Sequence, residues 1–419
     1  MGDVEPTAVD FDPHAETYLD GRHATWAELR RCPVSRSPHY GGFWVVSGYD
    51  EVAKVARDDT TFSSRYEPAP VDGLDYLGIT GIPRARGIPQ AGIAEADADV
   101  HVALRRLLNP FLLPGAIAAL TPFMEATTTW FLDQKIGDGQ MDMVLDFANP
   151  VPAVITMQLI GLPCDQWARY AEVFHGTVAY GTRTPEHRQA VALIPAMMTE
   201  LVAAVEERKR KPQADILTEL TRLRLDDGRL LTDEQIGSVL WNLVGGGLDT
   251  TTSLTSLALH HLNSDAGAPR RLVENPDLLP TATEEYLRFF CVNETLTRTV
   301  TKDTELGGQH LRRGDYLMVS WLSANLDEKV FEDAEELVLD RAPNRHLAFG
   351  VGPHRCIGLH MARALFQIMM REVLSRIPDY RIDTEATRFY QGNPELTGVV
   401  TMPTTFTPGA VTGRSEAPF

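Results

Sequence analysis

The sequence predicts a mainly α-helical protein with a small β-rich lobe. Apolar side chains recur at helical spacing through residues 113–210, along a stripe from Ile236 to Leu262, and again after Leu359. By contrast, Gly41–Gly48 is a short, glycine-bounded run of β-forming residues, typical of a hairpin arm. Length alone would suggest two or three domains, but we find no linker, repeat or low-complexity tract, so we expect one domain over residues 1–419.

Composition argues against several classes of protein. A formal net charge of −18 argues against non-specific nucleic-acid binding. The N-terminal stretch is polar and acidic, without the basic and apolar runs of a signal peptide or membrane anchor, so we expect a cytoplasmic protein with no membrane contact. The four cysteines lie far apart in the sequence and indicate no disulfide framework, as in a reducing compartment.

The stretch from Phe349 to Gly358 carries the clearest chemical signal, and it centres on Cys356. Glycines and a proline before the cysteine favour a tight loop, and the helical spacing that begins at Leu359 places Cys356 at a helix N-terminus. The free amides and the dipole there favour a thiolate, which suits a single axial bond to haem iron because no second ligand stands at zinc spacing. Gly358 leaves no side chain where a flat macrocycle would lie. For an isolated cysteine, a buried turn residue is the commoner interpretation.

Two charged pairs on predicted helices are further candidates. His101 and Arg105 stand at i and i+4, so they share a helix face and could hold one anionic group, while a solvated basic face is the alternative. Glu285 and Arg288 place opposite charges three residues apart, an arrangement that is worth only ~0.2–0.5 kcal/mol when it is exposed.

The predicted central helix contains an internal weakness. Thr232–Gln235 has the form of a capping box, and the apolar stripe that follows extends about 45 Å at 1.5 Å per residue. Gly245–Gly247 interrupts this stripe, and three interior glycines weaken a helix by roughly 3 kcal/mol relative to alanine. The glycines fit a helix-crossing contact or a surface that a flat ligand approaches. The Asp249 carboxyl and the Thr250 hydroxyl favour the second, as a proton route and a donor to bound dioxygen.

Together these segments resemble the cytochrome P450 family, the haem-thiolate monooxygenases, in its soluble bacterial form. The loop around Cys356 is similar to the family's haem-binding loop, and Gly246–Thr250 is similar to its Ala/Gly-Gly-x-Asp/Glu-Thr oxygen-activation motif. The resemblance runs from residue 95 to residue 405, although the proline that the family usually has shortly before the histidine is absent. The other matching segments are His101-x-x-x-Arg105, Glu285-x-x-Arg288 and Thr295–Arg298.

The resemblance implies a fold in which haem b lies between the long central helix and the helix that follows Cys356. Cys356 would be the metal ligand, and Asp249 and Thr250 would be the catalytic acid and alcohol. Glu285 and Arg288 would form a buried structural pair. The residues implied to bind the cofactor are His101, Arg105, Gly246, Arg298, Phe349, His354, Cys356 and Gly358, with His101, Arg105, Arg298 and His354 directed at the haem propionates.

The segments that would form the substrate pocket depart from the family pattern in one strand. Soluble members often have Ser-Pro-Val-Gln-Phe where this chain has Cys291–Thr295, so Asn293 and Glu294 either make the pocket more polar or point away, and we expect Asn293 to face the substrate. Residues 67–97 form a long irregular connection that covers the pocket in the family. The residues expected to line the pocket are Leu243, Val244, Gly247, Asn293, Glu294 and Val399.

The function that this resemblance implies is monooxygenation: one oxygen atom from O2 enters a small to medium, largely apolar substrate by hydroxylation or epoxidation. Electrons would come from NAD(P)H through a ferredoxin reductase and a ferredoxin, because no flavin or iron–sulfur domain is recognisable in the chain. Two alternatives stay open: oxidative coupling or peroxide-driven chemistry, and a haem binder or sensor without turnover. The arginines expected on the thiolate side, where they could steer an acidic donor, are Arg105, Arg106, Arg345, Arg355 and Arg363.

Overall fold

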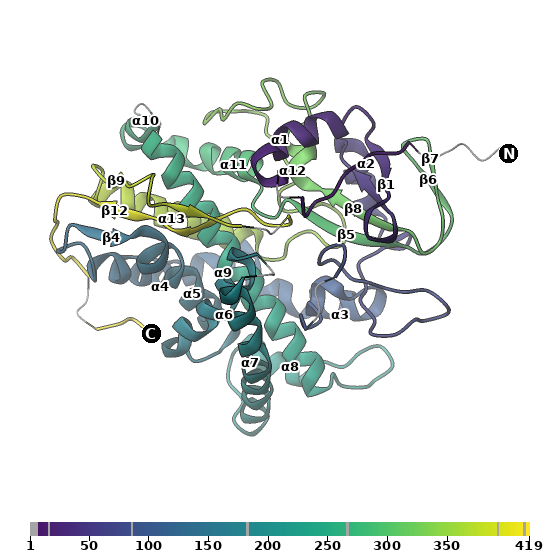
Figure 1. The fold of residues 1–419 in the computed structure, drawn as a ribbon. Coiled ribbons are helices and arrows are strands. Elements are labelled where there is room, and N and C mark those ends of the chain that lie inside the picture. The colour runs from purple at the N-terminus through teal and green to yellow at the C-terminus, as the bar shows by residue number, and fades with distance from the viewer. Residues whose placement is uncertain are drawn as a thin grey trace.

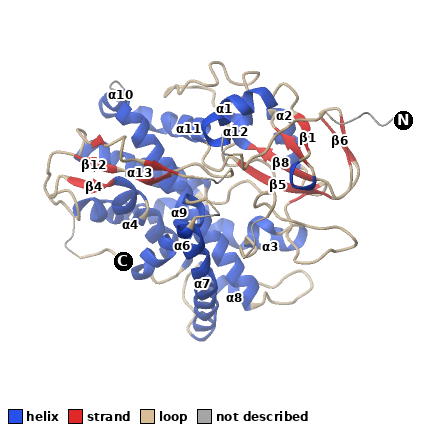
Figure 2. Ribbon diagram, viewed as in Figure 1, coloured by secondary structure: helices blue, strands red, loops and turns tan. Residues whose placement is uncertain are grey.

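The computed structural model describes residues 7–15, 17–84, 87–181, 184–264, 268–391, 394–413 and 416–419. The predicted mainly helical architecture is confirmed, with helices filling most of the molecule and strands gathered into small sheets at its edges (Figures 1 and 2). The helices are α1 (Tyr18–Leu29), α2 (Tyr49–Arg57), α3 (Ala98–Leu112), α4 (Pro114–Asp133), α5 (Pro150–Ile160), α6 (Trp167–Ala179), α7 (Pro185–Arg210), α8 (Ile216–Arg222), α9 (Asp233–Ser264), α10 (Ala268–Glu274), α11 (Leu279–Phe290), α12 (Trp321–Asn325) and α13 (Leu359–Arg376), with a π-helical turn, η3 (Met143–Ala148), before α5.

The β-rich lobe is built on a five-stranded sheet of order β1-β2-β8-β5-β3. The predicted hairpin arm forms here: β2 pairs antiparallel with β1, matching Val34 with Val46, and runs parallel to β8. All four side chains of β2 are buried, because helices of this lobe cover the sheet. The strands are β1 (Val34–Ser37), β2 (Phe43–Val46), β3 (Phe62–Ser63), β4 (Gln140–Asp142), β5 (Thr295–Val300), β6 (Thr304–Leu306), β7 (Gln309–Leu311), β8 (Tyr316–Ser320), β9 (Arg381–Ile382), β10 (Arg388–Phe389), β11 (Val399–Thr401) and β12 (Pro403–Thr405).

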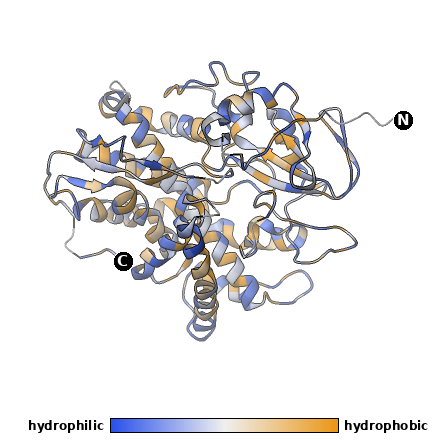
Figure 3. Cartoon of the chain, viewed as in Figure 1, coloured by the Kyte–Doolittle hydropathy of each residue, from blue (hydrophilic) through white to orange (hydrophobic). Residues whose placement is uncertain are grey.

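The long helix α9 is the centre of the helical lobe, where it packs against α5, α6, α7 and α13 (Figure 1). Its predicted capping box is present. The Thr232 amide donates to Gln235 Oε1 at 3.0 Å, and the Gln235 amide donates to Thr232 Oγ1 at 3.2 Å. Such caps contribute about 1 kcal/mol to helix stability, which offsets part of the cost of the interior glycines. Most helices carry both orange and blue segments in Figure 3, as expected when one face of a helix meets the core.

Two helical segments among the described residues are long and apolar enough to cross a membrane by length and composition. They are Met143–Ile160, 78% of which is buried inside the fold, and Pro185–Arg210, whose 18-residue apolar window is 28% buried. The bent pair Ala98–Leu112 and Pro114–Asp133 passes the same test as one broken segment. The first segment is therefore a core element, and all three contribute residues to the main hydrophobic cluster.

Candidate functional site

Backbone contacts define the shape of the loop before α13. The Cys356 amide donates to the Phe349 carbonyl at 2.8 Å, which closes the loop. Gly352 has a φ of 83°, and a Cβ there would lie 2.4 Å from the Ala56 carbonyl oxygen of α2. Because a positive φ and a backbone oxygen both exclude a side chain, only glycine fits this position. The loop is thus pinned against α2, and Cys356 keeps accessible surface although protein atoms surround its thiol.

The protein alone does not favour a thiolate at Cys356. Burial among protein atoms raises the pKa of the Cys356 thiol, while the Gly358 amide and the guanidinium groups of Arg105, Arg363 and Arg355 act in the opposite direction. The Gly358 amide at the helix N-terminus acts in the expected direction, towards the thiolate, but the desolvation of the thiol is the larger effect. A coordinated metal ion removes a thiol proton outright, so a metal would supply the missing stabilisation.

Arg298 is a buried cation on β5. Its side chain is enclosed, and its Nη1 donates to the Thr297 carbonyl at 2.7 Å. Burial lowers the pKa of Arg298 to about 10, with Asp97 and Asp59 acting in the opposite direction. No carboxylate lies within ion-pair distance of Arg298 in the described part of the chain. A buried guanidinium without such a partner is costly, so this position favours an anionic ligand.

His101 and His354 form a buried imidazole pair beside the same loop. Their ring centroids are 4.1 Å apart, and burial lowers the pKa of His101 to about 4, with the nearby His354 and Arg105 acting in the same direction. His354 Nε2 lies 3.4 Å from Asp97 Oδ1 but makes no hydrogen bond among the described residues. The other predicted propionate ligand, Arg105, donates through Nη1 to the Arg355 carbonyl at 2.8 Å. The N–H groups of His101, His354 and Arg105 could therefore donate hydrogen bonds to an anionic group.

The residues therefore fit a haem group by their chemistry. One accessible thiol, a buried arginine and an orphaned imidazole nitrogen provide a soft metal ligand and partners for carboxylates. A Cβ added at Gly246 or at Gly358 would meet no atom within 4 Å, which leaves room for a flat ring system on α9 and on the loop. Phe349, in the same loop, is held by the Arg363 guanidinium 4.6 Å from its ring centroid.

The three glycines of α9 have two different roles. A Cβ at Gly245 would lie 2.6 Å from the Phe174 ring, and one at Gly247 would lie 2.5 Å from Thr156 Oγ1. These two positions are close helix-crossing contacts with α6 and α5. Gly246, between them, is exposed in the middle of a 32-residue helix. Gly245 and Gly247 therefore make the helix-crossing contact, while Gly246 is open and its approach to a ligand stays a prediction.

The acid and the alcohol on α9 lie on different sides of the helix. Thr250 Oγ1 donates to the Gly246 carbonyl at 2.9 Å, on the open side. The Asp249 carboxylate is buried and contacts His175 Nδ1 of α6 at 2.9 Å and the Tyr390 hydroxyl. The structure does not join Asp249 and Thr250 by a hydrogen bond. His175 and Tyr390 have no local sequence signal, because they stand 74 and 141 residues from Asp249.

Several residues expected to line the substrate pocket lie elsewhere. Val244 and Val399 are fully buried in the main hydrophobic cluster, because their sides of α9 and β11 face the core. Gly247 packs closely against Thr156 of α5, and its place in the pocket stays a prediction. Leu243 is half-buried, and it lies one helical turn before Gly246 on the same side of α9.

Asn293 and Glu294, which precede β5, were also expected to line the substrate pocket. The Glu294 carboxylate is buried against Arg22 of α1, with 2.8 Å between Oε1 and Nη1, which fits the alternative that this side chain points away from the pocket. Burial raises the pKa of Glu294 to about 7 against the opposing effect of Arg22. Asn293 Oδ1 is buried without a hydrogen-bond partner among the described residues, and Asn293 bridges to Leu396.

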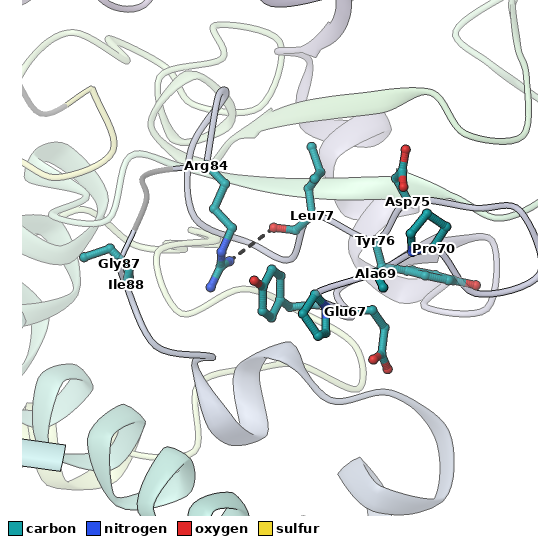
Figure 4. Close-up of a pocket in the computed structure, with 11 residues that line it drawn as sticks. Glu67, Ala69, Pro70, Asp75, Tyr76, Leu77, Arg84, Gly87 and Ile88 are labelled. Atoms are coloured by element: carbon teal, nitrogen blue, oxygen red, sulfur yellow. Dashed lines mark hydrogen bonds between the residues drawn. The ribbon is translucent and has the colours of Figure 1, made fainter. Parts of the chain in front are cut away.

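The predicted covering segment contains a hollow of about 380 Å³ (Figure 4). The aromatic rings of Tyr66 and Tyr76 contribute to its wall, and the Arg84 guanidinium lies 3.9 Å from the Tyr66 ring centroid. Arg84 is fixed by hydrogen bonds to the Leu77 carbonyl and to Glu95, a fully buried carboxylate. The segment is thus ordered by a buried ion pair at its base, although it is irregular.

Comparisons with known proteins agree with this geometry. The sequence pattern of the cytochrome P450 family matches residues 166–377. The mycinamicin IV hydroxylase/epoxidase of Micromonospora griseorubida is 30% identical over 93% of this chain and 95% of its own, and the linalool 8-monooxygenase of Pseudomonas putida is 28% identical over 88% and 91%. The structure of the Mycobacterium marinum cytochrome P450 CYP268A2 in complex with pseudoionone superposes with a TM-score of 0.85 at 25% identity, over 96% of this chain and all of that one.

The chain belongs to the cytochrome P450 family and is a cytochrome P450 monooxygenase. Membership implies haem iron as cofactor and O2 as co-substrate, and it implies a small-molecule substrate with a redox partner. The predicted family and fold are thereby confirmed.

Proposed function

We propose that this monooxygenase hydroxylates or epoxidises a small to medium, largely apolar organic molecule, with electrons from a ferredoxin and its NAD(P)H-dependent reductase. The observation that carries the proposal is the exposed Cys356 thiol at the start of α13, which packs against the α9 helix that bears Gly246 and Thr250. Relatives named as hydroxylase/epoxidase and monooxygenase support the reaction class. We further propose one domain over residues 1–419, in the cytoplasm.

The chain's own residues would hold the cofactor from two sides. Cys356 would bind the iron, and Arg298, His354, His101 and Arg105 would neutralise the propionates. Bound haem supplies the activation of dioxygen and the oxidation of a C–H or C=C bond. Gly246 and Gly358 would let the ring lie close to the backbone, since neither glycine has a neighbour where a side chain would stand.

The protons that monooxygenation consumes would pass along α9. The Thr250 hydroxyl lies on the open side of the helix and would donate a proton or hydrogen bond towards the reacting oxygen after leaving the Gly246 carbonyl. Asp249 would replenish it by a side-chain rotation or through water, because its carboxylate is directed to the opposite side. The intact acid–alcohol pair favours oxygenation over oxidative coupling or peroxide-driven chemistry.

Turnover under ¹⁸O2 with a surrogate ferredoxin and reductase tests this function. The probe is an apolar terpenoid or fatty-acyl compound that shifts the haem spin state. We expect its product to carry one ¹⁸O atom and to form only when NAD(P)H is present. Unlabelled product, or equal turnover with hydrogen peroxide alone, would support the alternative haem-thiolate chemistry. Spin-state shifts without any product across a chemically diverse set of probes would support a binder or sensor.

The surface proposed to bind the ferredoxin contains fewer free arginines than the sequence suggested. Arg106, Arg345 and Arg355 are exposed. Arg363 is not free to bind a ferredoxin, because its guanidinium forms two hydrogen bonds of 2.6 Å to Glu284. Although burial opposes the shift, Arg363 and a neighbouring histidine hold the pKa of Glu284 down to about 2. A charge change at Arg363 would therefore disturb the fold as well as the surface.

Charge reversal at Arg106 is expected to slow reduction by an acidic ferredoxin about tenfold at low salt, with the difference shrinking at 0.5 M salt because of screening. Stopped-flow reduction rates measure this. Arg388→Glu on β10, also exposed, makes the same change in net charge away from α3, in the two-stranded sheet of β10 and β11, and should leave the rate unchanged. Equal rates for wild type and Arg106→Glu at low salt would contradict the assigned docking surface.

A further inference from the structure

Asp249 is the most heavily enclosed titratable group on α9, and its partners are unexpected. His175 Nδ1 lies 2.9 Å from one carboxylate oxygen, and the Tyr390 hydroxyl contacts the other. The same hydroxyl accepts from Ser253 Oγ at 3.2 Å and lies 3.4 Å from His175 Nδ1. His175, Asp249 and Tyr390 are all at least nine-tenths buried. The three side chains come from α6, α9 and the segment after β10.

His175 also forms part of the wall of a hollow that opens to the surface. This hollow, of about 360 Å³, lies between α6, α7 and η3, and its polar lining includes Asn149, Glu172, Tyr180 and Glu186. His175 Nε2 has no hydrogen-bond partner among the described residues. The His175 ring therefore lies between a hollow that opens to the surface and the buried Asp249 carboxylate, and its Nε2 atom is enclosed in this structure.

We propose that His175 is a proton relay that carries protons from water in this hollow to Asp249. When local motion opens the enclosed Nε2 to the hollow, a hydronium ion there protonates it, and the Nδ1 proton passes to the Asp249 carboxylate, which leaves a neutral imidazole of the other tautomer. Rotation of the ring, or return of a proton through the Tyr390 hydroxyl, resets His175. One proton enters and one leaves, and no electron moves. The relay rests on the proposed monooxygenation, because it assigns the source of the protons which that reaction consumes.

The electrostatics of the cluster agree with this role. Burial lowers the pKa of His175, but the hydrogen bond and the charge of Asp249, with smaller effects from the Val400 backbone and Asp142, raise it above its ordinary value. Burial together with Asp249 raises the pKa of Tyr390, so this hydroxyl stays protonated. The charged residues that line the hollow with His175 are Glu172 and Glu186, while α5 and β11, which also pack against α6, carry no charged residue.

The sign of the pH dependence follows from the raised pKa. His175 is protonated below that pKa and can load Asp249, and it loses this capacity as the pH rises through it. Wild-type kcat should therefore fall on the alkaline side of the His175 pKa. In His175→Gln, kcat should be about tenfold lower at neutral pH, without that alkaline limb and with a larger solvent deuterium isotope effect. The matched control is His187→Gln, a buried histidine of α7 without a contact to Asp249, which should match wild type.

A second readout does not depend on turnover. In the reduced, carbon monoxide-bound protein with ¹⁵N-labelled histidine, the resonance that His175→Gln removes should titrate above the ordinary histidine range. Asp249→Asn should shift that titration to lower pH. A His175 resonance that is insensitive to Asp249→Asn would overturn the relay even if turnover cannot be measured.

The outcomes separate the relay from the proposed function. Wild-type protein that yields no oxygenated product overturns the function, while the titration still decides the relay. The relay is overturned if His175→Gln keeps the wild-type kcat, pH profile and isotope effect. It is also overturned if only KM changes, because the contact between His175 and Asp249 would then be a structural link between α6 and α9. If His175→Gln does not fold, Tyr390→Phe replaces it, since this change removes only a hydroxyl. The pH profile of kcat in Tyr390→Phe should lose part of its alkaline limb, and an unchanged profile also overturns the relay.

Discussion

Replacing Glu285 with alanine is expected to lower the free energy of unfolding by about 3–5 kcal/mol, because it leaves buried cations without their counter-charge. Arg288 donates to both carboxylate oxygens of Glu285 at 2.8 Å, and both side chains are fully buried. Glu285 also accepts from Arg341 Nε and Asn344 Nδ2. The remaining Arg288 donors bind carbonyl oxygens in the segment that leads to the Cys356 loop. The loss should therefore extend to the haem-binding loop.

The chain provides a control with the same spacing. Glu219 and Arg222 on α8 also form an i,i+3 pair, with 3.5 Å between the charged atoms and both side chains exposed. Glu219→Ala should cost about 0.5 kcal/mol or less. Urea unfolding followed by circular dichroism measures both variants, and haem content reports on the loop. Equal, small losses for the two variants would contradict the structural role of the buried pair.

Thr250→Ala is expected to separate electron consumption from product formation. The variant should reduce normally and consume NAD(P)H, while product per electron pair falls about tenfold or more and hydrogen peroxide is released, because the hydroxyl that delivers the proton is absent. Thr250 is not fully buried, and its hydroxyl bonds only to the Gly246 carbonyl in the described structure, so its removal should not disturb the fold.

The neighbouring threonine is the matched control for this change. Thr251 is buried on another side of α9, so Thr251→Ala should retain coupling close to wild type. Product and hydrogen peroxide, each quantified against NAD(P)H consumed, give the two ratios. Full coupling in Thr250→Ala, or loss of coupling in Thr251→Ala instead, would show that the alcohol was assigned to the wrong residue.

The sequence predicted features that depend on neighbouring residues. The Thr232–Gln235 cap forms as expected, since both partners lie within one helical turn. The turn before α13 follows from glycines whose conformation is local, and Gly352 is required by both its φ and its close approach to α2. The i,i+3 geometry of Glu285 and Arg288 was predictable for the same reason.

Features that depend on which side of an element meets the core were less predictable. Gly246 and Gly247 are adjacent, yet one is open and the other packs against Thr156, because a helix turns by about 100° per residue. Glu294 faces Arg22, which is 272 residues away in the sequence. The contact of Asp249 with His175 is equally remote, so no periodicity in α6 or α9 indicates it.

The carbon monoxide difference spectrum of the reduced protein, beside a Cys356→Ser control, tests the central claim most directly. A strongly red-shifted Soret band that is lost in Cys356→Ser is the predicted result, because thiolate ligation of the iron would produce this shift and histidine ligation would not. A band at the position of histidine-ligated haem, unchanged in Cys356→Ser, would mean that Cys356 is not the iron ligand and would contradict the assigned chemistry of the site.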